Sequence, residues 1–388
     1  MLRRKFNTGL ASLVLFSPLS LPSVAIAASF QGLGDLPGGS VSSSAAAVSA
    51  DGSVVVGGSS SGELAEAFRW TAETGMVALG DLPGGLRQSI GESVSGNGSV
   101  VVGFASGEGG TTAFRWTASD GMKELGEYPE QGTIYAYDVS ADGSTTVGVG
   151  RGFFGGQLPS QAVFWTADGQ PHPIAGPSNS RDSNAYGVSA DGSVIVGNVI
   201  MTVPERHFEA FRWTAETGMV PLGDLPGGAT SSTANEVTAD GSVVVGGSSS
   251  GIGSEAFRWT AAEGMRGLGI LPGWESSSAQ GVSDDGSIII GTLFRGDPRA
   301  NPEFSSFIWD ENRGMRYFQE AMEEEVGLDL AGWTTIGANA ISADGTTIVG
   351  TGRNSQGQPE AFIAVIPEPA SSALIVATAV CLSLRRRS

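Results

Sequence analysis

The chain has 388 residues, 59 of them glycine, and a formal net charge of −19. Nucleic acids and anionic membrane surfaces repel so acidic a body, so neither is expected to be its main partner. Its one cysteine, Cys381, excludes intramolecular disulfides and argues against thiol chemistry.

Residues 1–27 have the layout of a secretory signal peptide. A basic start is followed by a mostly apolar stretch, and Ala25 and Ala27 supply the small residues of a cleavage site. The alternative is a membrane-spanning helix. It is disfavoured because Pro18 and Pro22 interrupt a stretch that is already short for a span. The sequence therefore predicts that the protein is exported.

One sequence unit recurs along the rest of the chain. Its clearest copy, over residues 48–85, reads VSADGSVVVG, a short gap, EAFRWTAETG and MVALGDLPGG. Each copy has four short apolar runs separated by turn signals such as Asp51-Gly52, which is typical of a four-stranded propeller blade. The turn residue returns in seven copies: Asp51, Asn97, Asp142, Asp191, Asp240, Asp285 and Asp344.

The two ends of the repeat region complement each other. Residues 30–39 look like the fourth strand of a copy that lacks its first three, and the last copy stops after its third strand at 361–363. Pairing these segments would remove two open sheet edges. We therefore expect an all-β, seven-bladed β-propeller over residues 30–366, closed by the N-terminal strand, with the first strand of each blade at the axis. A parallel solenoid is the alternative, although its coils need no exchange between chain ends.

The connections between the second and third strands differ from copy to copy. Because strands within a blade alternate in direction, these loops share one face of the disc with the connections between blades. Variable loops on a rigid scaffold favour a binding surface, although insertions that are merely tolerated would look the same. The loops cover residues 58–65, 104–112, 149–161, 198–209, 247–254 and 292–305.

The sixth copy contains an insertion with helical spacing. Phe318, Met322 and Val326 recur at that spacing, and Gly327 supplies a stop. The pattern predicts a short helix over the loop-rich face, acting either as a lid or as a packed insertion.

Two repeated side chains have alternative interpretations. The arginines that alternate with the aromatics could grip an acidic polysaccharide, or could neutralise repeat carboxylates such as Glu66 between blades. The tryptophans, beginning with Trp70, could stack on sugars or fill the core, and their regular strand position favours the core. The arginines are Arg69, Arg115, Arg212 and Arg258.

Residues 367–388 form a second specific signal. Pro367, Glu368 and Pro369 precede an apolar run that ends in Arg385, Arg386 and Arg387. This order resembles the PEP-CTERM sorting signal of Gram-negative bacteria. The resemblance implies a short transmembrane sorting helix, cleavage near Pro367–Pro369 by an exosortase-type membrane protease, and release or attachment at the cell surface. A plain C-terminal anchor is the alternative.

The repeat segments quoted above resemble the HAF repeat of bacterial extracellular proteins. The resemblance covers residues 30–366 and departs from the pattern at Asn97, at the corner over 127–130 and at 170–174. It implies a repeat fold and an extracellular location, and it brings no assigned chemistry with it.

The sequence presents no visible catalytic constellation. His172 and His207 lie in different copies without metal-ligand partners at suitable spacing, and turn geometry explains the repeated Asp-Gly. We therefore predict no catalytic residue, cofactor or metal site, while calcium at the acidic turn around Asp284 stays open. The expected function is that of a non-catalytic cell-surface or extracellular-matrix protein that binds polysaccharide or protein through its loop-rich face. A propeller-type glycosidase or polysaccharide lyase is the alternative.

Overall fold

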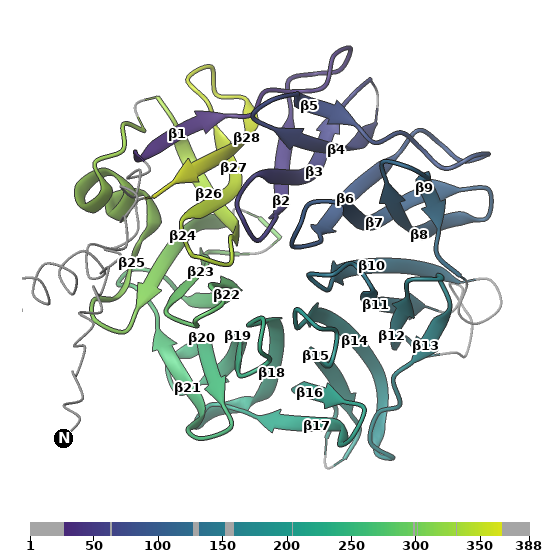
Figure 1. Cartoon of the computed structure of the whole chain (residues 1–388). Helices are drawn as coiled ribbons and strands as arrows, with labels where there is room; N and C mark the ends of the chain where they lie inside the picture. The colour runs from purple at the N-terminus through teal and green to yellow at the C-terminus, as the bar shows by residue number, and fades with distance from the viewer. Residues whose placement is uncertain are drawn as a thin grey trace, which may run out of the picture.

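The computed structural model describes residues 27–62, 64–126, 132–151, 159–203, 205–297, 299–300, 302–330 and 332–366. It shows an all-β fold in which antiparallel sheets stand around a central axis in the manner of propeller blades (Figure 1). The predicted all-β, propeller-type fold is confirmed. The sequence departure over 127–130 lies outside the described residues.

The strands form groups of four hydrogen-bonded neighbours, which we call units. The innermost strands are β2 (Ser43–Val48), β6 (Ser89–Val94), β10 (Thr133–Val139), β14 (Ser180–Val188), β18 (Gly227–Val237), β22 (Ser276–Val282) and β26 (Thr334–Ile341). The second strands are β3 (Val54–Ser60), β7 (Val100–Gly107), β11 (Thr145–Arg151), β15 (Val194–Met201), β19 (Val243–Ser250), β23 (Ile288–Arg295) and β27 (Thr347–Arg353). The third strands are β4 (Ala65–Thr71), β8 (Gly110–Thr117), β12 (Gln161–Thr166), β16 (His207–Thr214), β20 (Gly253–Thr260), β24 (Glu303–Asp310) and β28 (Pro359–Val365). The outermost strands are β5 (Gly75–Ala78), β9 (Gly121–Glu124), β13 (Pro171–Pro173), β17 (Gly218–Gly223), β21 (Gly264–Gly269), β25 (Gly314–Tyr317) and β1 (Ser29–Gly32).

Two pairings depart from the simple order along the chain. The strand β1 pairs antiparallel with β28, so that Gly32 faces Phe362 and the N-terminal strand lies beside the last strand of the described chain. The units of β18 and β22 are joined into one sheet by a single parallel bridge, between Ser254 of β20 and Ser276 of β22. Each innermost strand contacts those of the neighbouring units, and β26 contacts β2.

Apolar side chains fill the spaces between neighbouring units. Phe68 is fully buried and faces Gly57 across the sheet. At the equivalent position of another unit, a Cβ added to Gly291 would lie 2.2 Å from the Ser278 carbonyl oxygen and 2.6 Å from the Phe307 ring, so glycine leaves room for both the neighbouring strand and the aromatic side chain. Trp70 is only 7% exposed and lies in the same core, which confirms the core role predicted for the tryptophans.

The predicted helix is present as α1 (Phe318–Glu320) followed by the π-helical turn η1 (Ala321–Val326). Gly327 ends it in the left-handed conformation, with φ of 78°, as the stop signal predicted. Phe318 and Met322 are buried in one cluster with Phe362, which makes the segment a packed insertion. Figure 1 places it at the edge of the disc, in the connection from β25 to β26.

Candidate functional site

The Asp-Gly turns close one end of each innermost strand. Asp51 Oδ1 accepts hydrogen bonds from Ser49 Oγ (2.7 Å), the Ser53 amide (3.0 Å) and Ser53 Oγ (2.7 Å). These bonds, that from Ser49 most of all, lower the pKa of Asp51. Asn97 accepts the same three bonds through Oδ1, so its turn is intact. The repeated motif is therefore a turn support, as its sequence predicted.

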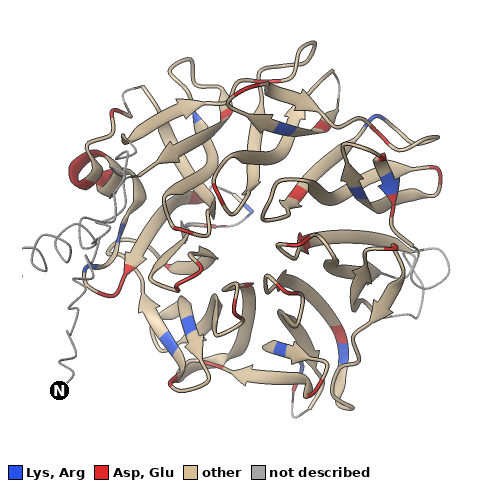
Figure 2. Ribbon diagram, viewed as in Figure 1, with Lys and Arg blue, Asp and Glu red and all other residues tan. Residues whose placement is uncertain are grey.

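Neighbouring turns are also hydrogen-bonded to one another around the axis. The Ala50 amide donates to the Gly96 carbonyl (3.1 Å), and the Ala343 amide donates to the Ala50 carbonyl (3.2 Å). In the sixth turn this position is Asp284, whose carboxylate accepts a hydrogen bond from the Ala239 amide and whose pKa is raised by burial. Acidic residues mark these turns around the centre of the disc (Figure 2). Among the described residues, no group of three or more His, Cys, Asp or Glu side chains is arranged to hold a metal.

Every innermost strand carries a β-bulge at the same position. In β10, for example, the register shifts between Ala136 and Asp138, which makes Tyr137 the extra residue. Bulges re-aim side chains, and here the extra residues line the central channel or its mouth. We call these extra residues the bulge ring; they are Ala46, Glu92, Tyr137, Tyr186, Asn235, Gln280 and Asn339.

The bulge ring is the place where the repeated units differ chemically. It holds an acid at Glu92, aromatic rings at Tyr137 and Tyr186, and an amide at Gln280, whereas the turn that follows is nearly the same in every unit. Residues that support the scaffold can be the same in every unit. Recognition of one ligand instead requires a particular set of different groups in one cavity. The channel is therefore the candidate functional site.

The position after the bulge adds further carboxyl groups to the channel. Asp138 accepts hydrogen bonds from Ser93 Oγ (2.6 Å) and from the amides of Val139 and Val188 (both 2.8 Å). Ser93 and Val188 belong to the units on either side, so this one carboxylate joins three units. Burial nevertheless raises the pKa of Asp138 to about 6.

A second carboxyl group, Glu236, extends over a glycine of the neighbouring unit. A Cβ added to Gly187 would lie 3.1 Å from Glu236 Oε1, so a side chain there would crowd this carboxyl group. Burial, and then the charge of Asp138, raise the pKa of Glu236 well above its usual range, and burial also raises that of Glu92. The two acids therefore influence each other's ionisation, because the charge of one disfavours the charge of the other.

Connected hollows open along the axis. One of about 750 Å³ lies at the mouth, where the innermost strands begin, and one of about 350 Å³ lies in the channel. Glu92, Gln280 and Asn339 line both, and Gln280 also borders a third hollow of about 300 Å³. Hydroxyl and amide groups are frequent in the lining, and no Lys or Arg of the described chain belongs to it. The mouth lies on the face that carries the loops between second and third strands.

Tyr137 and Tyr186 line the channel, and further aromatic rings pack beside them. The rings of Tyr135 and Tyr137 are parallel within 1°, with centroids 6.2 Å apart, and Tyr186 lies 5.4 Å from Tyr137. Phe104 packs edge-on against Tyr135 at 5.1 Å. We call Tyr135, Tyr137 and Tyr186 the tyrosine wall. Its rings are only half-buried.

The repeated arginines lie away from the mouth. Arg69 Nε donates to the Gly98 carbonyl (3.2 Å) in the Asn-Gly turn of the next unit, and Arg212 Nε donates to the Gly241 carbonyl (3.3 Å) in the Asp-Gly turn of the next unit. Of the four, Arg258 alone forms an ion pair within the described ranges, with Glu263. For Arg69 and Arg212 the prediction that they neutralise repeat carboxylates such as Glu66 is wrong, because turn carbonyls of the next unit accept their hydrogen bonds.

The two histidines occupy separate units, as the sequence indicated. The His172 ring stacks on Phe164 with centroids 4.8 Å apart. His207 Nε2 lies 3.7 Å from a Glu209 carboxylate oxygen. The structure does not bring the two rings into one site.

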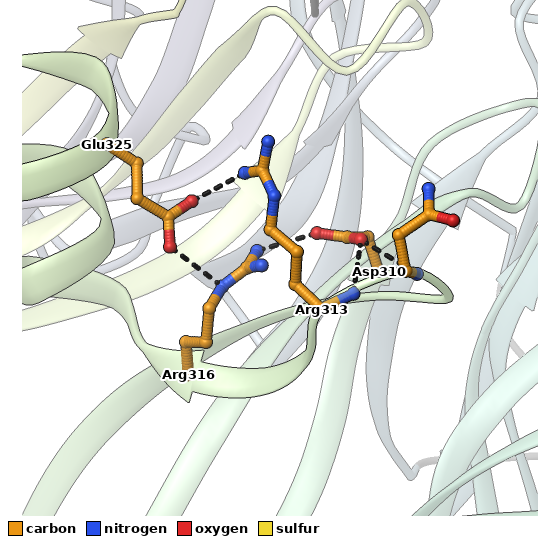
Figure 3. Close-up of polar contacts among 5 residues, drawn as sticks. Asp310, Arg313, Arg316 and Glu325 are labelled. Atoms are coloured by element: carbon orange, nitrogen blue, oxygen red, sulfur yellow. Dashed lines mark hydrogen bonds and ion pairs between the residues drawn. The ribbon is translucent and has the colours of Figure 1, made fainter.

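An ion-pair network fastens the helical insertion to its unit (Figure 3). Arg316 Nη2 lies 2.7 Å from Asp310 Oδ2, and Arg316 Nε lies 3.3 Å from Glu325 Oε1. Arg313 Nη1 binds the other oxygen of Glu325 at 2.5 Å. This network supports a structural role for the insertion.

No protein-family model matches the sequence, and no curated protein matches it. Among solved structures, the chain is similar to an oligogalacturonate lyase from Vibrio parahaemolyticus, with a TM-score of 0.53 and 10% identity over 89% of this chain and 98% of that one. It is similar to TolB from Acinetobacter baumannii with a TM-score of 0.44 and 13% identity, over 70% of this chain and 65% of that one. The Dos1 propeller gives a TM-score of 0.42 and 11% identity, over 82% and 77%. At these identities the likeness concerns the propeller fold alone.

Apart from Ala27, which is exposed, the predicted terminal signals fall outside the described part of the chain. This applies to Ala25, to the Pro367–Pro369 motif and to the arginines at 385–387. In the ranges that the structure describes, no helix combines the length and apolar character needed to cross a membrane.

The channel residues were not predicted from the sequence, because the prediction used the positions that are alike in every copy. The constant spacing between these residues and the turn could have identified them. Each bulge-ring residue precedes the turn residue by the same distance, as Tyr137 precedes Asp142 and Gln280 precedes Asp285. Aligning the copies on their turns and asking which nearby position changes would have identified the ring.

Proposed function

We propose that this is a non-catalytic exported protein of the cell surface or extracellular matrix, which binds polysaccharide at the mouth of its central channel. The observation that carries the proposal is the bulge ring, where a repeated scaffold places non-repeated polar and aromatic side chains in one cavity. A ligand at this mouth would meet groups from several units at once.

We also propose that the units are seven blades of one closed propeller, with β1 as the outer strand of the last blade. Three observations support closure: β1 pairs with β28, the Leu33 amide donates to the Ala361 carbonyl (2.8 Å), and Phe30 stacks on Phe362 with centroids 5.0 Å apart. The bridge between β20 and β22 involves one residue pair, so it leaves two blades in contact rather than one large blade.

The lining favours a polysaccharide over a protein as the ligand. Serine hydroxyls can donate and accept hydrogen bonds in any rotamer, and amides provide both groups at fixed spacing, which suits ligands rich in hydroxyl groups. Ser42, Ser44 and Ser60 line the mouth together with Gln280 and Asn339. A large apolar patch, which a protein partner would favour, is not what these residues provide.

The proposed location depends on the two terminal signals. Residues 1–27 support export, and the PEP-CTERM resemblance of residues 367–388 supports processing by an exosortase-type protease in a Gram-negative bacterium. Replacing Pro367–Pro369 with alanines should leave the full-length protein in the membrane fraction. Mass spectrometry of the C-terminus in producing cells tests this directly.

A glycan array probed with the purified chain, combined with an assay for reducing-sugar release, tests the proposed function. Binding without product supports a non-catalytic receptor. Failure to bind any glycan would overturn the proposal.

The alternative, a propeller-type glycosidase or polysaccharide lyase, is favoured by one specific observation. Asp138 and Glu236 are neighbouring channel carboxyls with raised pKa values, and a protonated acid beside a carboxylate is what glycoside hydrolysis uses. Product release that disappears in Glu236→Gln would establish this alternative.

A further inference from the structure

We infer that the polysaccharide bound at the mouth is neutral, and that its sugar rings rest against the tyrosine wall. This rests on the proposed function and specifies its ligand class. It excludes uronic-acid and sulfated chains as the preferred ligand.

The acidic side chains around the cavity are the reason to expect a neutral ligand. Glu92 lines both the mouth and the channel, and Asp138 and Glu236 lie deeper along the axis. Within the described chain, no cationic side chain lines these hollows to balance an acidic sugar. An anionic ligand would meet like charge and lose hydration without gaining a partner.

The repeated arginines cannot supply the missing positive charge. Arg69 and Arg212 bind the turn carbonyls of Gly98 and Gly241. Those turns follow the ends of the innermost strands, whereas the mouth lies where these strands begin. The side chains of Arg69 and Arg212 therefore form hydrogen bonds at the end of the channel opposite the mouth.

The tyrosine wall is the reason to expect that sugar rings pack in the channel. Tyr137 and Tyr186 both line the channel, and their centroids are 5.4 Å apart. An aromatic face packs well against the C–H face of a pyranose ring. Neutral sugars present such faces without adding charge.

Hydrogen bonds fix the orientation of two side-chain amides in the bulge ring. Asn339 Nδ2 donates to the Ala45 carbonyl (2.7 Å), and Asn235 Nδ2 donates to the Ala279 carbonyl (2.7 Å). Each side chain is thus fixed by its nitrogen, and its carbonyl oxygen is the group offered to a ligand hydroxyl. Fixing these side chains in advance reduces the entropy lost on binding.

The test compares neutral and acidic oligosaccharides of equal length on the purified chain. Isothermal titration calorimetry is run with glucan, mannan and galactan hexasaccharides and with hexagalacturonate, at low and at high salt. We expect a neutral hexasaccharide to bind with an affinity that salt does not change, and hexagalacturonate to bind at least tenfold more weakly.

Variants then locate the site. Tyr137→Ala and Tyr186→Ala should each weaken neutral binding about tenfold, while Tyr137→Phe keeps the stacking surface and should lose much less. Gln280 is exposed, so Gln280→Ala tests the same mouth even if a tyrosine variant fails to fold. Val220→Ala, an exposed change on the outermost strand β17, is the control and should bind normally.

The outcomes separate the two proposals. Preference for hexagalacturonate would overturn the neutral-ligand inference and leave polysaccharide binding standing. No binding of any glycan would overturn both. Neutral binding that survives Tyr137→Ala, Tyr186→Ala and Gln280→Ala would show that the ligand lies elsewhere.

Discussion

Closure of the propeller can be tested at Leu33, which directly follows β1. Its side chain is 6% exposed and packs between the first and last units with Leu36 and Ile363. Changing Leu33 to Ala removes this contact without touching the channel. Leu86→Ala is the matched control, because Leu86 follows a Leu-Pro-Gly-Gly corner and is 64% exposed.

The expected magnitude follows from burial. Truncating a buried leucine to alanine costs roughly 2–5 kcal/mol, because apolar contacts are lost and a cavity remains. A loss of about 3 kcal/mol lowers the ratio of folded to unfolded protein about 100-fold. An exposed leucine has few contacts to lose, so Leu86→Ala should change the free energy of unfolding by less than about 0.5 kcal/mol.

Urea denaturation followed by tryptophan fluorescence measures both variants. Hydrogen exchange of β28 provides a local readout, because β28 is hydrogen-bonded to β1 in the closed ring. Equal midpoints for Leu33→Ala and Leu86→Ala, with unchanged exchange in β28, would show that the N-terminal strand does not close the ring.

Three further outcomes are expected. Asp51→Ala should lower the free energy of unfolding, measured in urea, by about 1–2 kcal/mol, because the turn loses a hydrogen-bond acceptor. Asp51→Asn keeps an acceptor and should leave the free energy of unfolding nearly unchanged. Equal losses in the two variants would contradict the role of Asp51 in the turn. Burial raises the pKa of Asp138 to about 6, and burial together with the charge of Asp138 raises that of Glu236, so the protonated forms favour folding and this contribution to stability is lost as pH rises through the two raised pKa values. Glu236→Gln should flatten this fall in thermal stability with pH, and an unchanged slope would refute the coupling. Arg316→Leu should speed hydrogen exchange of the helical insertion, while the more exposed Arg313→Leu should have a smaller effect, and the reverse order would contradict the network's geometry.

Several interactions could be predicted from the sequence because they are local. The bonds around Asp51 span two residues in either direction, and Phe68 faces Gly57 within one hairpin that recurs in nearly every copy. The helical spacing from Phe318 to Val326 likewise predicted a helix. Short-range chemistry of this kind is the same wherever the segment is placed.

The position of a segment relative to other units could not be predicted in the same way. The sequence predicted the helical insertion but not its partners, because Phe318 and Met322 pack in one buried cluster with Phe362 of the last strand. Arg69 was expected to bind a carboxylate and instead binds the Gly98 carbonyl of the next unit. Both outcomes depend on which surfaces meet after the units have packed.

The sequence by itself determined the repeat, its turns and its all-β propeller type, since these arise from hydrogen bonds and packing inside one unit. Only the tertiary structure decided that Glu92, Tyr137 and Gln280 share one cavity, because they come from strands that are far apart in the chain. A bulge repeated around a common axis turns these separate residues toward the same space.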